Sequence, residues 1–179
     1  MKVHFITPYS TDKNLGRAYN EAFRLVGDED WVCLTDYDTM FLTPDAPAIV
    51  QEYVNRFPDT ALFTCYTNRV HPCSTEQLVQ GTIIDNSDIR YHIQIAERTK
   101  KNLYTVSQVH KNVSGMLMVM SKKQWRETPF VEDLKCLGVD TELSKTLRER
   151  GQPVQRMNGL YIWHTYRIMN GIRDKSHLL

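Results

Sequence analysis

Two aspartates follow an apolar run, and their spacing suits the binding of a cation. Residues 31–42 read WVCLTDYDTMFL, with Asp36 and Asp38 separated by one residue. In an extended chain such residues project to the same side, and adjacent carboxylates repel each other unless a cation or hydrogen-bond donors neutralise them. A hard divalent ion such as Mg²⁺ or Mn²⁺, with its shell completed by phosphate oxygens, suits this pair. The pattern is also typical of a turn before Thr39, in which the carboxylates have only a local role.

The segments around this pair predict an α/β fold. Short apolar runs predict buried strands at 3–7, 31–35, 61–66, 115–120 and 160–166. Apolar residues at helical spacing predict helices at 12–27, 45–57 and 141–151, the last with Asp140 or Thr141 as its N-cap. Because strands and helices alternate, we expect a mainly parallel, Rossmann-like sheet with helices on both faces. Ligands bind beyond the carboxyl ends of strands in such sheets, which is where Asp36 and Asp38 emerge.

The remaining segments have weaker patterns. Residues 67–112 are polar, and within them DIRYHIQIAERTKK (88–101) fits a helix and a strand almost equally; we predict a helix. A basic tail with Arg167, Arg173 and Lys175 follows the last apolar run.

Composition excludes several classes of partner. The 179 residues are 41% hydrophobic and 24% charged, the balance of one ordinary globular domain. A formal charge of +1 and a pI of about 7.7 provide no global field for nucleic acid. No apolar run reaches the roughly 18 residues of a membrane span, and residues 1–10 lack the pattern of a signal peptide. We therefore expect no membrane span and a cytoplasmic location. The four cysteines lack CxxC spacing and are interpreted as structural thiols.

Taken together, six segments in order resemble the GT-A class of nucleotide-sugar glycosyltransferases, as a minimal version of a family 2 enzyme. They are the loop ITPYS, the helix KNLGRAYNEAF, the strand and acidic pair WVCLTDYDTMFL, Ser114-Gly115 before MLMVM, the segment GVDTELSKTLRERG, and the histidine in YIWHTYR. The resemblance implies metal-dependent transfer of a sugar from a nucleoside-diphosphate sugar to an acceptor hydroxyl, with inversion. UDP is the first candidate for the nucleotide and GDP the second. It also implies a nucleotide- and metal-binding half, 1–66, and an acceptor-binding and catalytic half, 67–179.

The resemblance assigns metal ligands. Asp36 and Asp38 would hold Mn²⁺ or Mg²⁺, with Asp38 as the more direct ligand, and His164 would add a further ligand. The alternative for His164 is a core histidine beside Trp163.

Residues that match the nucleotide-contacting edge of the family lie near the first strand and in the acidic motif. They are Thr7, Pro8, Tyr9, Asn14, Arg17, Asp36 and Tyr37. Thr-Pro-Tyr is also ordinary turn chemistry, and Arg17 is also typical of a solvated helix residue.

Inverting transfer requires a base that accepts the proton of the acceptor hydroxyl. Asp140 begins the helix at 141–151, where backbone N–H groups and the helix dipole favour a carboxylate. The alternative is that Asp140 only caps the helix. Because Val139 stands where the family often has an acid, Glu142 is the substitute candidate.

The sequence departs from the family in one connection. Only residues 27–30 join the first helix to the Asp-x-Asp strand, where full-length members carry another strand and helix that contribute to recognition of the base. Residues 67–112 are expected to shape the acceptor pocket, with Arg69, His71 and Gln94 as polar candidates.

Two other functions fit part of the sequence. The segment WVCLTDYDT matches the first motif of haloacid dehalogenase-type phosphatases, with Asp36 as nucleophile and Asp38 as acid/base. That reading lacks a later strand ending in paired acids. A non-catalytic module that binds a nucleotide sugar is the third possibility.

Overall fold

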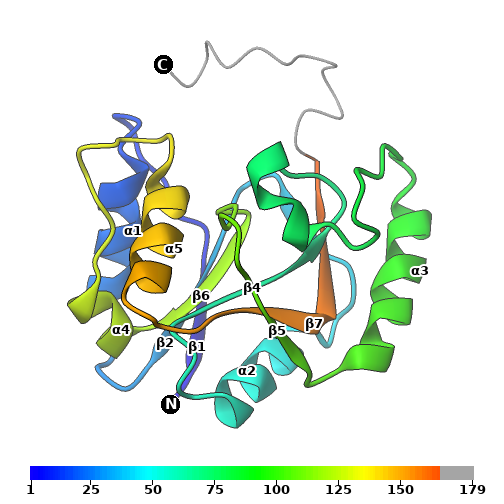
Figure 1. Cartoon of the computed structure of the whole chain (residues 1–179), viewed down its shortest axis with the longest axis horizontal. Helices are drawn as coiled ribbons and strands as arrows, with labels where there is room; N and C mark the ends of the chain where they lie inside the picture. Colours follow the sequence, from blue (N-terminus) through cyan, green and yellow to red (C-terminus); the bar gives the residue numbers. More distant parts are fainter. Residues whose placement is uncertain (166–179) are drawn as a thin grey trace.

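A mixed sheet of seven strands forms the centre of the computed structural model, which describes residues 1–165 (Figure 1). The strands are β1 (Val3–Ile6), β2 (Trp31–Thr35), β3 (Thr39–Phe41), β4 (Leu62–Thr67), β5 (Val106–Gln108), β6 (Leu117–Ser121) and β7 (Val154–His164). Their order is β1-β2-β6-β4-β7-β3, and β5 pairs with β7. All five predicted strands are present, whereas β3 and β5 were not predicted. Tyr166 and the predicted basic tail lie outside the described residues.

Most of the helices begin at a residue whose side chain caps the first turn, or at a proline. They are α1 (Leu15–Arg24), α2 (Ala46–Arg56), α3 (Ile89–Thr99), α4 (Lys122–Glu127) and α5 (Val139–Glu149), with short 3₁₀ turns η1 (Pro72–Gln77) and η2 (Lys100–Asn102). The side chains of Asn14, Asp88 and Ser121 accept backbone N–H groups at the starts of α1, α3 and α4. The predicted helix at 88–101 is thus confirmed.

The start of α5 differs from the prediction. Its N-cap is Gly138, which has a left-handed backbone (φ 82°), and Val139 is the first helical residue. Asp140 and Thr141 therefore lie inside the first turn, and the prediction that one of them is the N-cap is wrong. Glycine adopts this backbone conformation without the steric cost that other residues incur.

The sheet is mixed, so the expectation of a mainly parallel sheet is wrong. Only β1–β2 and β4–β7 are parallel, whereas β6 runs antiparallel to both β2 and β4, and β3 and β5 run antiparallel to β7. The chain reaches β6 at the carboxyl end of β2, where the Asp36 N–H donates to the Met116 carbonyl, and β6 must then run back. A fully buried apolar strand has the same composition in either direction, so composition does not indicate whether β6 runs parallel or antiparallel to its neighbours.

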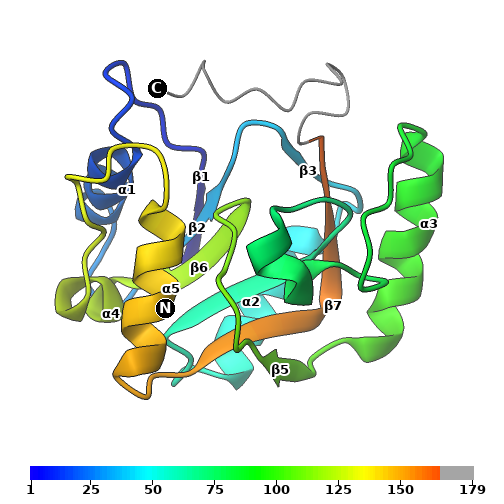
Figure 2. The ribbon, with the colours of Figure 1, turned by 45° about the horizontal axis from the view of Figure 1, so that its top comes forward.

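Helices cover both faces of the sheet, as predicted. Trp31 and Cys33 of β2 pack in the same cluster as Val50 of α2, and Val32 and Leu34 pack in a second cluster with α1 and α5. This alternation follows from the two-residue period of a strand. Figures 1 and 2 show α1, α4 and α5 gathered at one side of the molecule and α3 at the other.

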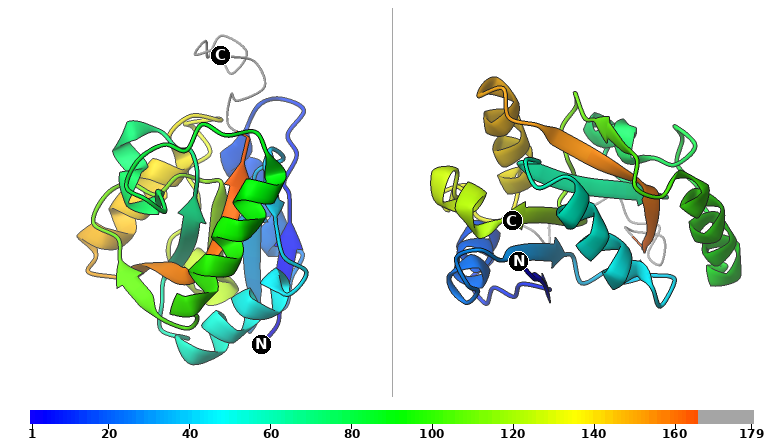
Figure 3. Two further views of the ribbon diagram at one scale, coloured as in Figure 1. Left: turned by 90° about the vertical axis from the view of Figure 1, so that its right-hand side faces the viewer. Right: turned by 90° about the horizontal axis from the view of Figure 1, so that it is seen from below.

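β7 is a long strand that changes its position relative to β4. Met157 pairs with Cys65, but Tyr161 pairs with the next residue, Tyr66, so residues 158–160 have no partner on β4. The first part of β7 pairs with β5 and the last part with β3. Figure 3 shows α3 alongside this strand. This shift in register between β4 and β7 brings the end of β7 next to the turn that follows β2.

Within residues 1–165, no helix combines the length and apolar character that crossing a membrane requires. Cys33 and Cys65 are buried, and Cys73 and Cys136 are partly exposed.

The hydroxyl of Tyr53 is expected to stabilise the irregular part of β7. This buried oxygen accepts the N–H groups of Tyr104 (3.0 Å) and Gly159 (2.8 Å). Tyr53→Phe leaves both donors unpaired, so the free energy of unfolding should fall by about 2 kcal/mol. Urea unfolding measures the change. Tyr9→Phe is the control, because Tyr9 is 83% exposed and its replacement should change stability little. Equal stability of the Tyr53 and Tyr9 variants would contradict the prediction.

Candidate functional site

The two aspartates lie in a tight turn between β2 and β3. The Asp36 carbonyl accepts the Thr39 N–H (3.3 Å) and the Thr39 hydroxyl (2.7 Å). The backbone of residues 36–39 is therefore a turn, and the expectation of an extended chain there is wrong. The carboxylates nevertheless converge: one oxygen from Asp36, one from Asp38 and one ring nitrogen of His164 lie within 4.8 Å of one another. The predicted metal ligands are thus brought together.

Backbone contacts on both sides hold His164 beside the turn. β3 and β7 pair so that Thr39 lies opposite His164, and the Thr165 N–H donates to the Asp38 carbonyl (2.9 Å). The Asn68 side-chain amide donates to the His164 carbonyl (3.0 Å), and its oxygen accepts the His164 N–H (2.8 Å). Asn68 is fully buried, so no water competes for these bonds.

The ring of His164 is oriented for a cation. Its Nδ1 lies 2.8 Å from the Arg69 carbonyl, which can only accept, so Nδ1 carries the proton. In the neutral ring Nε2 then has a lone pair, and it lies 3.4 Å from Asp38 Oδ1. Two acceptors facing each other require a proton or a cation between them. A histidine that donates its other N–H to a carbonyl is the usual arrangement in metal sites.

Asp36 is half-buried, and its surroundings disfavour the charged form of its carboxylate. Its pKa is raised to about 6, mainly by burial; the charges of Asp38 and Asp140 also raise it, while the charge of His164 and a hydrogen bond from Tyr19 lower it. Tyr19 is a buried residue of α1. Asp36 is therefore a group that binds a proton readily when no cation is present.

Asp140 lies behind Asp36 and is held by backbone donors. Its Oδ2 accepts the Gly115 N–H (2.6 Å), and its Oδ1 accepts the Thr141 N–H (2.7 Å). A Cβ at position 115 would lie 3.3 Å from both Asp140 Oδ2 and the Tyr19 hydroxyl, so glycine permits this close approach. Burial raises the pKa of Asp140, while these N–H groups lower it. Glu142 is half-buried on α5 and is not one of the three converging residues.

Among the residues predicted to contact the nucleotide, those of the first loop and of the acidic turn differ in position from those of α1. Thr7 lies next to the site, because its hydroxyl is 3.0 Å from the hydroxyl of Thr35, the residue before Asp36. Tyr37 in the turn is 89% exposed, Tyr9 is exposed and Pro8 is half-buried.

The two predicted nucleotide-binding residues of α1 have local roles. Asn14 caps the helix by accepting the Arg17 N–H, and the Arg17 guanidinium pairs with Asp12. Neither is among the three converging residues.

The polar candidates for the acceptor pocket are separated. Arg69 is adjacent to the site through its carbonyl, and its guanidinium pairs with Asp85 (2.6 Å). His71 contacts Cys73 (Nδ1 to Sγ, 3.0 Å), and Gln94 is exposed on α3. Only Arg69 therefore has a contact with one of the converging residues.

Tyr19 and Asn68 were not predicted to be part of the site. Gly115 was named only as part of the segment before MLMVM, without its hydrogen bond to Asp140. Asn68 directly follows β4, and a polar residue at a strand end is a signal that could have pointed to it. Tyr19 carries no such signal, because an aromatic residue on the apolar side of a helix is also typical of the core.

Comparison with models of known protein families gives no match, and comparison with curated protein sequences gives no significant match.

The raised pKa of Asp36 predicts opposite pH dependences for stability and metal binding. The folded chain holds the Asp36 proton more tightly than the unfolded chain, whose value is near 3.8. Without metal, the Asp36 contribution to the free energy of unfolding should therefore decrease as the pH rises from about 4 to about 6. Mn²⁺ affinity should increase over the same interval, because the ion requires the carboxylate.

Urea unfolding in EDTA and Mn²⁺ titration, each at several pH values, measure the two trends. Asp36→Asn is the comparison, and it should lose this component of the stability change. Identical pH profiles of stability in the wild type and Asp36→Asn would contradict the assignment.

Proposed function

We propose that this chain is a metal-dependent glycosyltransferase that moves a sugar from a nucleoside-diphosphate sugar to an acceptor hydroxyl. UDP is the first candidate for the nucleotide, GDP the second, and Mn²⁺ or Mg²⁺ is the cofactor. The observation that carries the proposal is the convergence of Asp36, Asp38 and His164 within 4.8 Å, with His164 Nδ1 bonded to a carbonyl. When bound, a divalent ion here supplies positive charge that stabilises the leaving diphosphate.

The surroundings of the metal ligands support a nucleotide donor. Asp36 and Asp38 follow the carboxyl end of β2, and Thr7 follows the end of the parallel strand β1. Ligands of open α/β sheets bind at such an edge. The exposed rings of Tyr9 and Tyr37 offer flat apolar surface against which a base can stack.

Asp140 is the proposed base, with Glu142 as the substitute. Burial raises the pKa of Asp140, which brings the carboxylate closer to the range in which it accepts a proton efficiently. Each oxygen accepts one backbone N–H, and each retains lone-pair capacity for a further proton or hydroxyl. The bond from the Gly115 N–H also lets Asp140 position the loop before β6. A variant that loses turnover but keeps binding therefore distinguishes a base from a residue that only positions this loop.

The alternatives explain fewer contacts. A phosphatase of the haloacid dehalogenase type uses Asp36 and Asp38 but gives His164 no role. A binding module uses the metal ligands but requires no base at Asp140.

Metal dependence is the first expected result. Sugar transfer should stop in EDTA and return with Mn²⁺ or Mg²⁺, and Asp38→Ala should cost more activity than Asp36→Ala. His164→Ala should weaken Mn²⁺ affinity by about 10-fold or more. His110→Ala is the matched control, because His110 is exposed and is not one of the converging residues.

A panel of sugar nucleotides screened by thermal shift, with and without Mn²⁺, identifies the donor, because a ligand of the folded state raises its stability. Full transfer activity in EDTA would rule the scheme out. Hydrolysis of p-nitrophenyl phosphate inhibited by fluoroaluminate would instead identify a phosphatase, and Mn²⁺-dependent binding without turnover would identify a binding module.

Asp140→Asn tests the base. We expect turnover to fall about 100-fold or more with sugar-nucleotide binding nearly unchanged. Asparagine keeps one acceptor oxygen, so one of the two N–H donors loses its partner and the free energy of unfolding should fall by about 1 to 3 kcal/mol. Single-turnover transfer, donor titration and urea unfolding measure the three quantities. Wild-type turnover in Asp140→Asn together with loss in Glu142→Gln would move the role to Glu142. Activity in both variants would exclude the inverting mechanism proposed here.

A further inference from the structure

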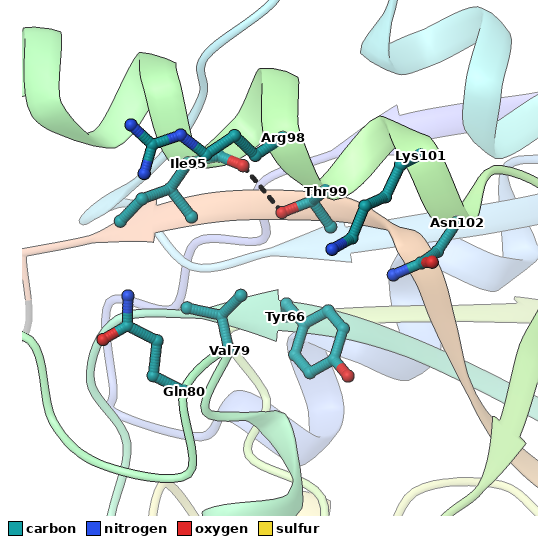
Figure 4. A pocket seen from close by; sticks show the side chains of 8 residues that line it. All are labelled: Tyr66, Val79, Gln80, Ile95, Arg98, Thr99, Lys101 and Asn102. Carbon is teal, nitrogen blue, oxygen red and sulfur yellow. Dashed lines mark hydrogen bonds between the residues drawn. The ribbon is translucent and has the colours of Figure 1, made fainter.

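A cavity of about 220 Å³ lies between β4 and the end of α3, outside the metal-ligand group. Its apolar wall consists of Tyr66, Val79 and Ile95. Figure 4 shows these side chains facing one another across the gap, with residues of α3 and η2 on one side and Tyr66 and Val79 on the other. The volume is below the roughly 300 Å³ at which pockets for drug-sized molecules begin, so a ligand of about one ring fits.

The polar groups around this cavity are cations and amides. Arg98 and Lys101 contribute the charges, Gln80 and Asn102 contribute amides, and no carboxylate lines the cavity. Among the described residues, neither Arg98 nor Lys101 has a salt bridge, whereas the neighbouring Lys100 pairs with Asp45 and Glu97. In Figure 4 the Lys101 amino group is turned toward the gap. Two cations without a compensating carboxylate favour an anion.

A third cation lies behind the aromatic wall. The Arg156 guanidinium is 4.0 Å from the centre of the Tyr66 ring. Its other contacts are with the Glu76 carbonyl and the Asn158 side-chain oxygen, which are neutral acceptors. Within residues 1–165 no carboxylate forms a salt bridge with Arg156, so its charge adds to the positive potential at Tyr66.

The cavity is built on the strand pair that also leads to the metal ligands. Tyr66 lies two residues before Asn68, roughly 7 Å along the chain at the rise of a strand. Tyr66 is itself paired with Tyr161 of β7. Tyr66, one of the three wall residues, is therefore part of the sheet and is held in place independently of any ligand.

We propose that this cavity binds a small organic anion, in which a carboxylate or phosphate meets Lys101 and a single ring or short apolar chain packs on Tyr66, Val79 and Ile95, while Arg98 adds positive charge at the other end of the cavity (Figure 4). The cations select the charge, and the apolar wall excludes a fully hydrated ion such as free phosphate. This proposal does not depend on the transferase assignment, because none of these residues is a metal ligand.

Titration of the full chain with phenyl phosphate, benzoate, benzyl alcohol and inorganic phosphate tests the proposal, by ligand-observed NMR at low salt. EDTA is present throughout, so that the metal ligands hold no ion. Phenyl phosphate or benzoate should bind with a Kd of about 1 mM or tighter, and benzyl alcohol about 10-fold more weakly or worse. The better of the two charged rings identifies the preferred anion. Binding should weaken as salt is added.

Matched variants locate the site. Lys101→Gln should weaken binding of the charged ring by about 5- to 10-fold, and Arg98→Gln, which removes a more distant charge, should weaken it less. Arg90→Gln is the control, since Arg90 is an exposed residue of the same helix that pairs with Asp88 and does not line the cavity. Unfolding curves for each variant confirm that the fold is retained. Asp38→Asn should leave binding unchanged, which separates this result from failure of the proposed function.

Several outcomes would overturn the proposal. They are absence of binding by both charged rings, equal binding of benzyl alcohol, equal binding of inorganic phosphate, or an Arg90→Gln effect as large as that of Lys101→Gln.

Discussion

The pair of hydrogen bonds between the Asn68 side chain and the backbone of His164 is the contact on which the site depends. It links the segment after β4 to the end of β7, so that neither can shift without breaking two buried bonds. The pairing of Thr39 with His164 then fixes the turn that carries Asp36 and Asp38. The position of three side chains is thus set mainly by backbone contacts, which hold more rigidly than exposed side-chain pairs.

The three carboxylates of the site differ in the groups that stabilise their negative charge. Two N–H donors offset part of the cost of burying the Asp140 carboxylate, and Asp36 accepts a hydrogen bond from the Tyr19 hydroxyl. Asp38 instead faces an imidazole nitrogen at 3.4 Å. Since backbone dipoles are fixed whereas a cation can leave, Asp140 keeps its donors in every state, whereas the partner of the Asp38 carboxylate depends on what is bound.

The sequence predicted the elements better than their arrangement. Runs such as WVCLT and GMLMVM identify strands because a short buried segment needs no other pattern, and the acidic pair at a strand end pointed to two of the three residues that converge. The antiparallel course of β6 was missed, because apolar composition does not specify direction. The turn at residues 36–39, the change of position in β7 and the contact between Tyr19 and Asp36 depend on residues far apart in the chain, which periodicity does not report.

The position of β7 in the sheet has a consequence for folding kinetics. This strand, residues 154–164, pairs with β3, β4 and β5, all of which precede it by tens of residues. Closing such long loops costs entropy before the contacts form, so pairings of this kind are slow. The candidate metal ligand His164 is at the end of this strand. During synthesis the acidic turn is therefore made long before its histidine, and a chain that has released only its first half has two carboxylates without the third ligand.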